Sequence, residues 1–236
     1  MKKSCPSPKA IGNLSSISLQ WADMASLWEF SRQEACYLLS FSSHPGPAFL
    51  SSYLCAGLLH NEQLILPSYI LLYFSSFLSS LLFRRLYPSD LDFQETSNRK
   101  ETSSVFSLGE ALDASIMNSF VSITKLGGYI ILFSLFQGIL KMLPYPPPDL
   151  KCLLLGFTEI TTGTMAITER NWKLSLSYPL TLAFTAFGGL CIIFQTKSML
   201  NDTDLPLTPY LKGKCCSFFL TLILGTLFIK IIEIIV

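Results

Sequence analysis

Three long stretches of this sequence are apolar and almost free of charge, and they constrain the fold more than any other feature. They cover residues 64–83, 174–196 and 215–236, the last of which carries only Lys230 and Glu233 near its end. A hydrocarbon core of about 30 Å is crossed by about 20 apolar residues in a helix. Because backbone polar groups in lipid must be satisfied within the segment itself, each stretch is predicted to be a transmembrane helix.

The composition supports the same conclusion for the whole chain. Half of the 236 residues are hydrophobic, only 14% are charged, and the mean hydropathy is +0.46. Soluble domains carry charge on about a quarter of their residues. The formal net charge of +1, without a long run of Lys or Arg, gives a nucleic-acid partner no electrostatic basis. We therefore predict an all-α, polytopic protein of the cell membrane, in contact with the lipid bilayer.

A fourth transmembrane helix is predicted over residues 120–140, and the residues before it have an amphipathic pattern. Apolar side chains recur there at helical spacing, which favours a helix over 105–119 that lies along the membrane surface. This helix would then turn into the bilayer at Gly127 and Gly128. A single long, bent helix fits the pattern equally well, so both interpretations stay open.

Two further apolar segments, at about 37–60 and 152–168, are too short or too interrupted for ordinary spans. The first contains the run from Ser42 to Pro47, which is unfavourable to helix, and the second contains Glu159 and two glycines. Short, interrupted segments of this kind indicate discontinuous or re-entrant helices near a binding site. Two ordinary spans of low hydrophobicity are the alternative.

The order of these segments predicts two repeats, because each half ends in a strong transmembrane helix. Residues 1–87 would form a first repeat, which is incomplete, and residues 105–236 a second one. The polar stretch 88–104 between them is predicted to be an exposed loop. Duplicated halves are the common construction of secondary transporters.

Glu159 is the most informative side chain for function. Inserting an acid near the middle of a membrane helix costs about 2.5 to 3.5 kcal/mol, so such an acid is usually paired or faces a cavity that contains water. Thr161 and Thr162 stand beside it, and Gly163 is expected to let the helix unwind there. Hydroxyls, free carbonyls and one carboxylate could bind a small polar solute or a coupling cation. Alternatively, Glu159 lies at a helix end near the interface, where an acid costs little.

Other candidate binding residues come from the two apolar segments on either side. In the second half, Gly188 and Gly189 would face Glu159, with Gln195 two turns later. Adjacent glycines allow a ligand to approach the backbone, although close helix packing is the more frequent reason for them. In the first half, Ser42 and Ser43 offer hydroxyls, while the neighbouring His44 is expected to be an exposed loop residue.

The sequence has no pattern that indicates an enzyme, a cofactor or a metal site. The seven cysteines show no C-x-x-C spacing, and there are only two histidines. Nucleophile, phosphate-binding and zinc-protease motifs are missing too. The cysteines are expected to be reduced packing residues.

Four stretches together resemble a known family. GFTEITTG (156–163), AFGGLCIIFQ (186–195), FSRQEACYLLSFSSHPGPAF (30–49) and LGEALDASIMNSFVSITKLGGYIILFSLF (108–136) are similar to the sporulation integral membrane protein family (YlbJ-like). These proteins carry the nucleoside recognition, or Gate, domain. The resemblance covers roughly residues 10 to 230.

The resemblance implies a multi-pass protein that acts in sporulation and is built on a solute-transporter scaffold. By analogy, the pocket residues would include Glu159, Thr161 and Gly163, together with Gly188, Gly189 and Gln195, and the solute would be nucleoside-like. A non-transporting assembly or signalling protein of spore formation is the alternative, with a second copy or other sporulation membrane proteins as partners.

The chain departs from the family at two places. Gly12 is followed by Asn13 and Leu14 where a proline is expected, and Ser42 and Ser43 stand in place of paired asparagines. We therefore expect a short, divergent or truncated member.

Overall fold

The structure is a computed structural model that describes residues 32–85, 108–200 and 205–235. Within these ranges the chain forms helices and short connections, without any β-strand. The predicted all-α class is confirmed. The loop predicted over 88–104 and the start of the predicted first repeat lie outside the described residues.

Four helical stretches are long and apolar enough to cross a membrane: Glu62–Arg84, Ser115–Met142, Leu174–Leu200 and Thr208–Ile234. They correspond to the helices η3 (Glu62–Leu64) with α3 (Ile65–Arg84), α4 (Leu108–Met142), α7 (Leu174–Phe187) with α8 (Gly189–Leu200), and α9 (Thr208–Ile235). The chain is a multi-pass integral membrane protein, as its charge-free stretches predict.

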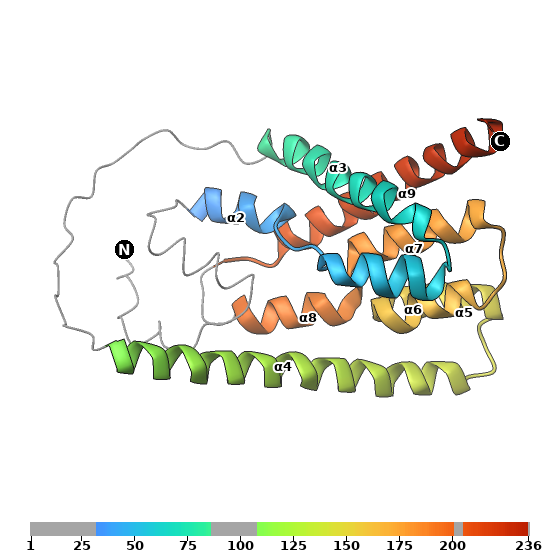
Figure 1. The fold of residues 1–236 in the computed structure, drawn as a ribbon. Helices are drawn as coiled ribbons and strands as arrows, with labels where there is room; N and C mark the ends of the chain where they lie inside the picture. Colours follow the sequence, from blue (N-terminus) through green and yellow to red (C-terminus); the bar gives the residue numbers. More distant parts are fainter. Residues whose placement is uncertain (1–31, 86–107, 201–204, 236) are drawn as a thin grey trace.

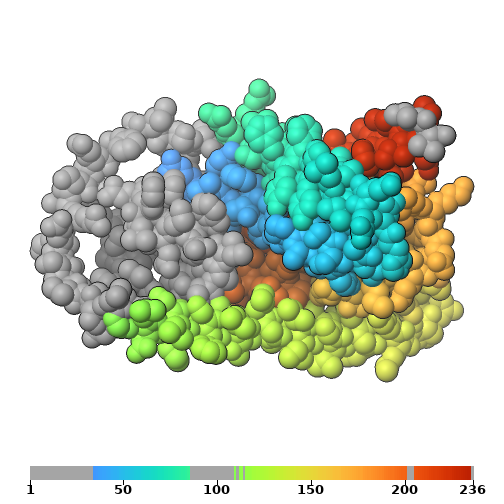
Figure 2. Space-filling view, in the orientation of Figure 1, coloured from blue at the N-terminus to red at the C-terminus, as the bar shows by residue number. Residues whose placement is uncertain are grey.

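Helix α4 decides between the two interpretations of residues 105–140. Its 35 residues form one uninterrupted helix along one side of the molecule (Figure 1), so the predicted turn at Gly127 and Gly128 does not occur. A helix of this length is about 52 Å long. Large apolar side chains on it, including Phe120, Ile123 and Leu135, are exposed, and α4 forms one edge of the space-filling view (Figure 2). A bilayer would cover this apolar surface.

Helices follow one another in the same order in the two halves of the described chain. In the first half, the half-helix α2 (Arg32–Phe41) is followed by a break, the short π-type helix η2 (Phe49–Leu58) and the long helix α3. In the second half, α7, a break at Gly188, α8 and the long helix α9 follow one another in the same way. The similarity between the halves is one of helix order.

The two units run in opposite directions, as contacts at both ends of α7 demonstrate. Near its start, Tyr178 shares a hydrogen bond of 3.1 Å with Ser68 of α3, just beyond η2. Near its end, the side chain of Lys214 donates hydrogen bonds to two backbone carbonyls. One is that of Ala186 in α7, and the other is that of Ser43 in the break between α2 and η2. The α2–η2 pair is therefore antiparallel to α7, which is visible in Figure 1. Units that run in opposite directions are common in transporters.

Helix α9 packs against α2, α3 and α7 and holds the two units together. Two of its glycines bring backbones close: a Cβ on Gly213 would lie 1.7 Å from the carbonyl oxygen of Ser40, and one on Gly225 would lie 3.2 Å from Pro179. Between them, the hydroxyl of Thr221 donates a 2.7 Å hydrogen bond to the hydroxyl of Ser75 in α3. Small residues at these positions permit the close packing typical of membrane helices.

Two predicted helix boundaries differ from the structure. The span predicted over 174–196 is interrupted, because Gly188 and Gly189 have φ of 85° and 78°. Only glycine adopts such left-handed backbone without strain, and it commonly ends helices there. The helix predicted to begin at residue 215 already begins at Thr208, so it includes two lysines that were expected to lie before it.

Candidate functional site

Residues 148–168 form a helical hairpin that reverses at Glu159. Helix α5 (Pro148–Thr158) and helix α6 (Ile160–Thr168) are separated by this one residue, whose backbone is extended (φ −155°, ψ 139°). A Cβ on Gly163 would lie 2.2 Å from Cα of Gly156, and these two glycines are equally far from the Glu159–Ile160 junction. The two helices are therefore antiparallel, with Glu159 at the tip of the hairpin.

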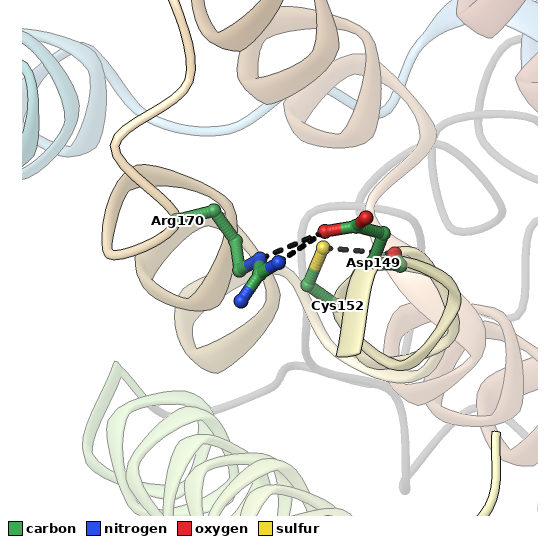
Figure 3. A network of polar contacts seen from close by, with 3 residues as sticks. All are labelled: Asp149, Cys152 and Arg170. Carbon is green, nitrogen blue, oxygen red and sulfur yellow. Dashed lines mark hydrogen bonds and ion pairs between the residues drawn. The ribbon is translucent and has the colours of Figure 1, made fainter. Parts of the chain in front are cut away.

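The base of the hairpin is closed by an ion pair (Figure 3). Arg170 donates from Nε and Nη2 to one carboxylate oxygen of Asp149, at 2.9 Å and 2.5 Å, while the Cys152 thiol donates to the Asp149 carbonyl at 3.0 Å. Arg170 follows α6 and Asp149 begins α5, so both ends of the hairpin lie side by side. The two side chains are 39% and 63% exposed. Exposed pairs contribute about 0 to 1 kcal/mol, so this one fixes geometry more than stability.

At the tip, the carboxylate of Glu159 caps the helix that follows it. Its oxygens accept hydrogen bonds from the backbone N–H groups of Thr161 (2.8 Å) and Thr162 (3.0 Å) and from the Thr161 hydroxyl. Glu159 is 5% exposed. A negative charge at a helix N-terminus satisfies free N–H groups and is favoured by the helix dipole. The acid is therefore buried and hydrogen-bonded to its own chain.

The expected role of Gly163 needs correction. The helix was predicted to unwind at Gly163, but the break lies at Glu159 and Gly163 is inside α6. Gly163 is in close contact with the backbone of Gly156, and Gly156 in turn lies against the ring of Phe184 in α7. Both glycines are present because the two arms of the hairpin pack backbone to backbone.

The hairpin tip meets the break between α7 and α8. A Cβ on Gly189 would lie 3.0 Å from Cα of Glu159 and 3.0 Å from the carbonyl oxygen of Thr158. Gly188 ends α7, and its N–H donates to the carbonyl of Phe184 at 2.9 Å. The structure thus places Glu159, Thr161, Thr162, Gly163, Gly188 and Gly189 in one region, where four helix ends meet.

A glutamine from α4 completes this region. The side-chain amide nitrogen of Gln137 lies 3.1 Å from the carbonyl oxygen of Leu155, 3.4 Å from the Thr158 hydroxyl and 3.5 Å from the carbonyl of Glu159. Gln137 is 1% exposed, and its Oε1 has no hydrogen-bond partner in the described part of the chain. The amide nitrogen of Gln137 thus supplies a donor to the carbonyls at the carboxyl end of α5, while its own Oε1 is a buried acceptor that is not used.

The serines predicted in the first half lie at a second centre. The carbonyl oxygen of Ser43 accepts a 2.6 Å hydrogen bond from Nζ of Lys214, and its hydroxyl accepts one of 3.4 Å from Tyr210. Ser42 continues α2, with its N–H bonded to the carbonyl of Leu38. His44 is not the exposed loop residue that was expected, since its Nε2 lies 2.6 Å from the hydroxyl of Ser76 in α3.

The side chain of Gln195 forms its hydrogen bond outside both centres. Its amide donates to the sulfur of Cys191 in the same helix, α8, at 3.2 Å. The cysteines that the structure describes are all free; four of them are buried, as packing residues would be, whereas Cys215 is exposed. In the same ranges, no group of three His, Cys, Asp or Glu side chains is arranged to hold a metal ion.

Gln137 and Lys214 are two buried polar residues at these centres that the sequence analysis did not select. A Gln in the otherwise largely apolar stretch 126–140 is a signal for Gln137, because an amide is costly in lipid. The sequence around Lys214 gives no such signal. Lys212 lies two positions before it, and together the two lysines are typical of the polar start of a membrane helix.

The chain is similar to a curated protein, the Sporulation integral membrane protein YlbJ of Bacillus subtilis (strain 168). The two sequences are 23% identical over 214 residues, which cover 77% of this chain and 52% of the relative. The chain thus spans about half the length of that relative. No protein-family model matches, and no solved structure matches. This similarity confirms the resemblance to a YlbJ-like sporulation integral membrane protein that the four sequence stretches predict.

Proposed function

We propose that this chain acts in sporulation as part of a membrane protein that binds, and moves, a small polar solute at the hairpin tip. The name of the relative, a sporulation integral membrane protein, supports the sporulation role. The solute site comes from the geometry around Glu159. We take a nucleoside as the first solute class to test, because the Gate-domain resemblance implies it. The proposal includes no catalytic step.

The observation that carries the proposal is the meeting of four helix ends between long apolar helices. Irregular backbone at membrane depth is tolerated only where protein covers it or where it lines a cavity with water. Half-helices whose ends meet near a re-entrant segment are typical of solute sites in secondary transporters. Here the α5–α6 junction at Glu159 lies against the α7–α8 junction at Gly189. Backbone polar groups of both junctions are thus close together.

Gln137 supports a solute that carries hydrogen-bond donors. Its Oε1 is a buried acceptor without a partner in the described residues. Leaving such a group unsatisfied costs about 1 to 3 kcal/mol. A hydroxyl or N–H of a solute would supply the missing donor, while Glu159 could exchange a hydrogen bond within its own helix for one to the solute.

Binding of radiolabelled uridine and adenosine to the purified full chain in lipid nanodiscs tests this proposal. We expect saturable binding that Glu159→Gln and Gln137→Leu each weaken about tenfold or more, because each loses a hydrogen bond to a buried polar group. Glu169→Gln is the matched control, since Glu169 is an exposed acid at the other end of α6. Thermal unfolding midpoints of all variants separate lost binding from lost folding.

Two results would reject the solute site. One is the absence of saturable binding for every nucleoside in a panel. The other is binding that Glu159→Gln weakens no more than Glu169→Gln does.

A second function is favoured by the hydrogen bonds of Glu159 itself. Both carboxylate oxygens are engaged within the chain, and Gly156, Gly163 and Gly189 are in close backbone contact. These are the features of a rigid packing motif, as a non-transporting assembly or signalling protein of spore formation would need. Capture of a stoichiometric protein partner after mild solubilisation, together with no nucleoside binding, would support this function.

A further inference from the structure

Lys214 places a buried ammonium group in the interior of the helix bundle. The residue is 4% exposed and lies in the second turn of α9. Its Nζ donates to the carbonyl oxygens of Ser43 at 2.6 Å and Ala186 at 3.1 Å, and lies 5.7 Å from the centre of the Tyr210 ring. Within the described ranges these contacts include no carboxylate. An ionisable group in such a place is costly and usually functional.

Both acceptors belong to the carboxyl ends of broken helices. Ala186 lies in the last turn of α7, and Ser43 follows the last turn of α2. The last four carbonyls of a helix have no partner within it, and the helix dipole makes this end negative. Because the two units run in opposite directions, the negative ends of α2 and α7 both point at Nζ of Lys214. Two half-helix dipoles thus replace the missing carboxylate.

The packing of α9 brings the ammonium to this point. Gly213 directly precedes Lys214, and a Cβ there would overlap the carbonyl oxygen of Ser40 in α2. Only a glycine lets α9 come this close to the end of α2. The close approach and the lysine therefore form one arrangement.

Free carbonyls and the carboxyl ends of half-helices are the groups that hold Na⁺ or a proton in transporters with broken helices. We infer that the place where the carboxyl ends of α2 and α7 meet is a cation site whose cation is built in, namely the ammonium of Lys214. The protein then binds no free Na⁺ or K⁺ at this place, and any movement of solute is not coupled to a metal ion there. The statement about coupling rests on the proposed function, because it concerns the movement of the solute. The arrangement around Lys214 does not depend on a solute.

Thermal unfolding of the purified full chain, without solute, tests the inference separately from the proposed function. The midpoint is measured at constant ionic strength in chloride salts of Na⁺, K⁺, methylammonium and the bulky cation N-methyl-D-glucamine. We expect the wild type to have the same midpoint in all four. Lys214→Gln should lower it by about 5 °C or more, because Gln keeps N–H donors but loses the charge. Lys212→Gln, at an exposed lysine of the same helix, should leave it unchanged.

Lys214→Ala provides the rescue experiment. It removes the ammonium and its stem, so methylammonium should recover at least half of the lost midpoint while N-methyl-D-glucamine recovers none. If this variant cannot be purified, the unfolding midpoints of Lys214→Arg and Lys214→Gln are compared instead. The inference requires the arginine variant, which keeps the positive charge, to have the higher midpoint. A glutamine variant as stable as the Lys212→Gln control overturns the inference, and so does an alanine variant that no small cation stabilises.

Discussion

At the scale of single residues, Glu159 combines a backbone break with a helix cap. The side chains that usually cap helices are Ser, Thr, Asp and Asn. Glu159 reaches the N–H groups of Thr161 and Thr162 with a longer side chain. The sequence marks it as unusual because an acid in an apolar segment is costly, but it does not reveal the cap. The extended backbone at Glu159 accompanies its contact with Gly189, which is distant in the sequence.

Removing the Glu159 cap should destabilise the protein measurably. Loss of an N-cap costs about 0.5 to 2 kcal/mol, which corresponds to a midpoint lower by about 2 to 8 °C in a chain of this size. We expect Glu159→Ala to fall in this range and Glu169→Ala, at the other end of α6, to have little effect. Differential scanning fluorimetry of the full chain in detergent measures both. Equal midpoints for the two variants would mean that Glu159 does not cap α6.

At the scale of helices, the hairpin is held by close backbone contact more than by its ion pair. The Asp149–Arg170 pair is exposed, whereas Gly156 and Gly163 leave no space for a side chain between the arms. The aromatic rings of Phe157, Phe184 and Phe218 then fasten the hairpin to α7 and α9, with ring centres 4.9 to 5.6 Å apart. The hairpin is thus positioned by packing along its length.

An alanine at position 163 should therefore be far more harmful than an alanine elsewhere in a membrane helix. Its Cβ would overlap the backbone of Gly156, and overpacking of a core typically costs about 1 to 3 kcal/mol. We expect the midpoint of Gly163→Ala to fall by about 3 to 10 °C. Gly138→Ala in α4 is the control, because nothing lies within 4 Å of the added Cβ there and alanine favours helix. If Gly138→Ala proved equally destabilising, the hairpin contact would not be the cause.

At the scale of the whole molecule, hydropathy and length predict which segments cross the membrane but not where helices break or begin. The helix predicted over 64–83 agrees closely with α3, while the helix predicted from residue 215 begins earlier, at Thr208. Charge explains that difference, since Lys212 and Lys214 precede the apolar stretch 215–236 and are typical of the polar residues that flank a membrane helix. The acceptors of Lys214 lie 171 and 28 positions away in the sequence, so no local pattern could indicate its burial.

The candidate site was predictable only in part, for the same reason. Glycine pairs and an acid in an apolar segment pointed to residues 156–163 and 188–189, which the fold brings together. What each residue does there depends on its neighbours in space. Gly163 packs instead of unwinding, Gln195 bonds within its own helix, and Gln137 enters from α4.

The membrane topology of residues 148–170 tests the re-entrant hairpin most directly. The full chain, with its seven native cysteines replaced, would carry a single cysteine at Leu150 or at Glu169, both of which are exposed. A membrane-impermeant maleimide is applied to right-side-out and inside-out vesicles. A hairpin that turns back at Glu159 places both positions on the same side, so both should be labelled in the same vesicle preparation. Labelling of the two positions from opposite sides would show that the segment crosses the membrane, and the hairpin would be contradicted.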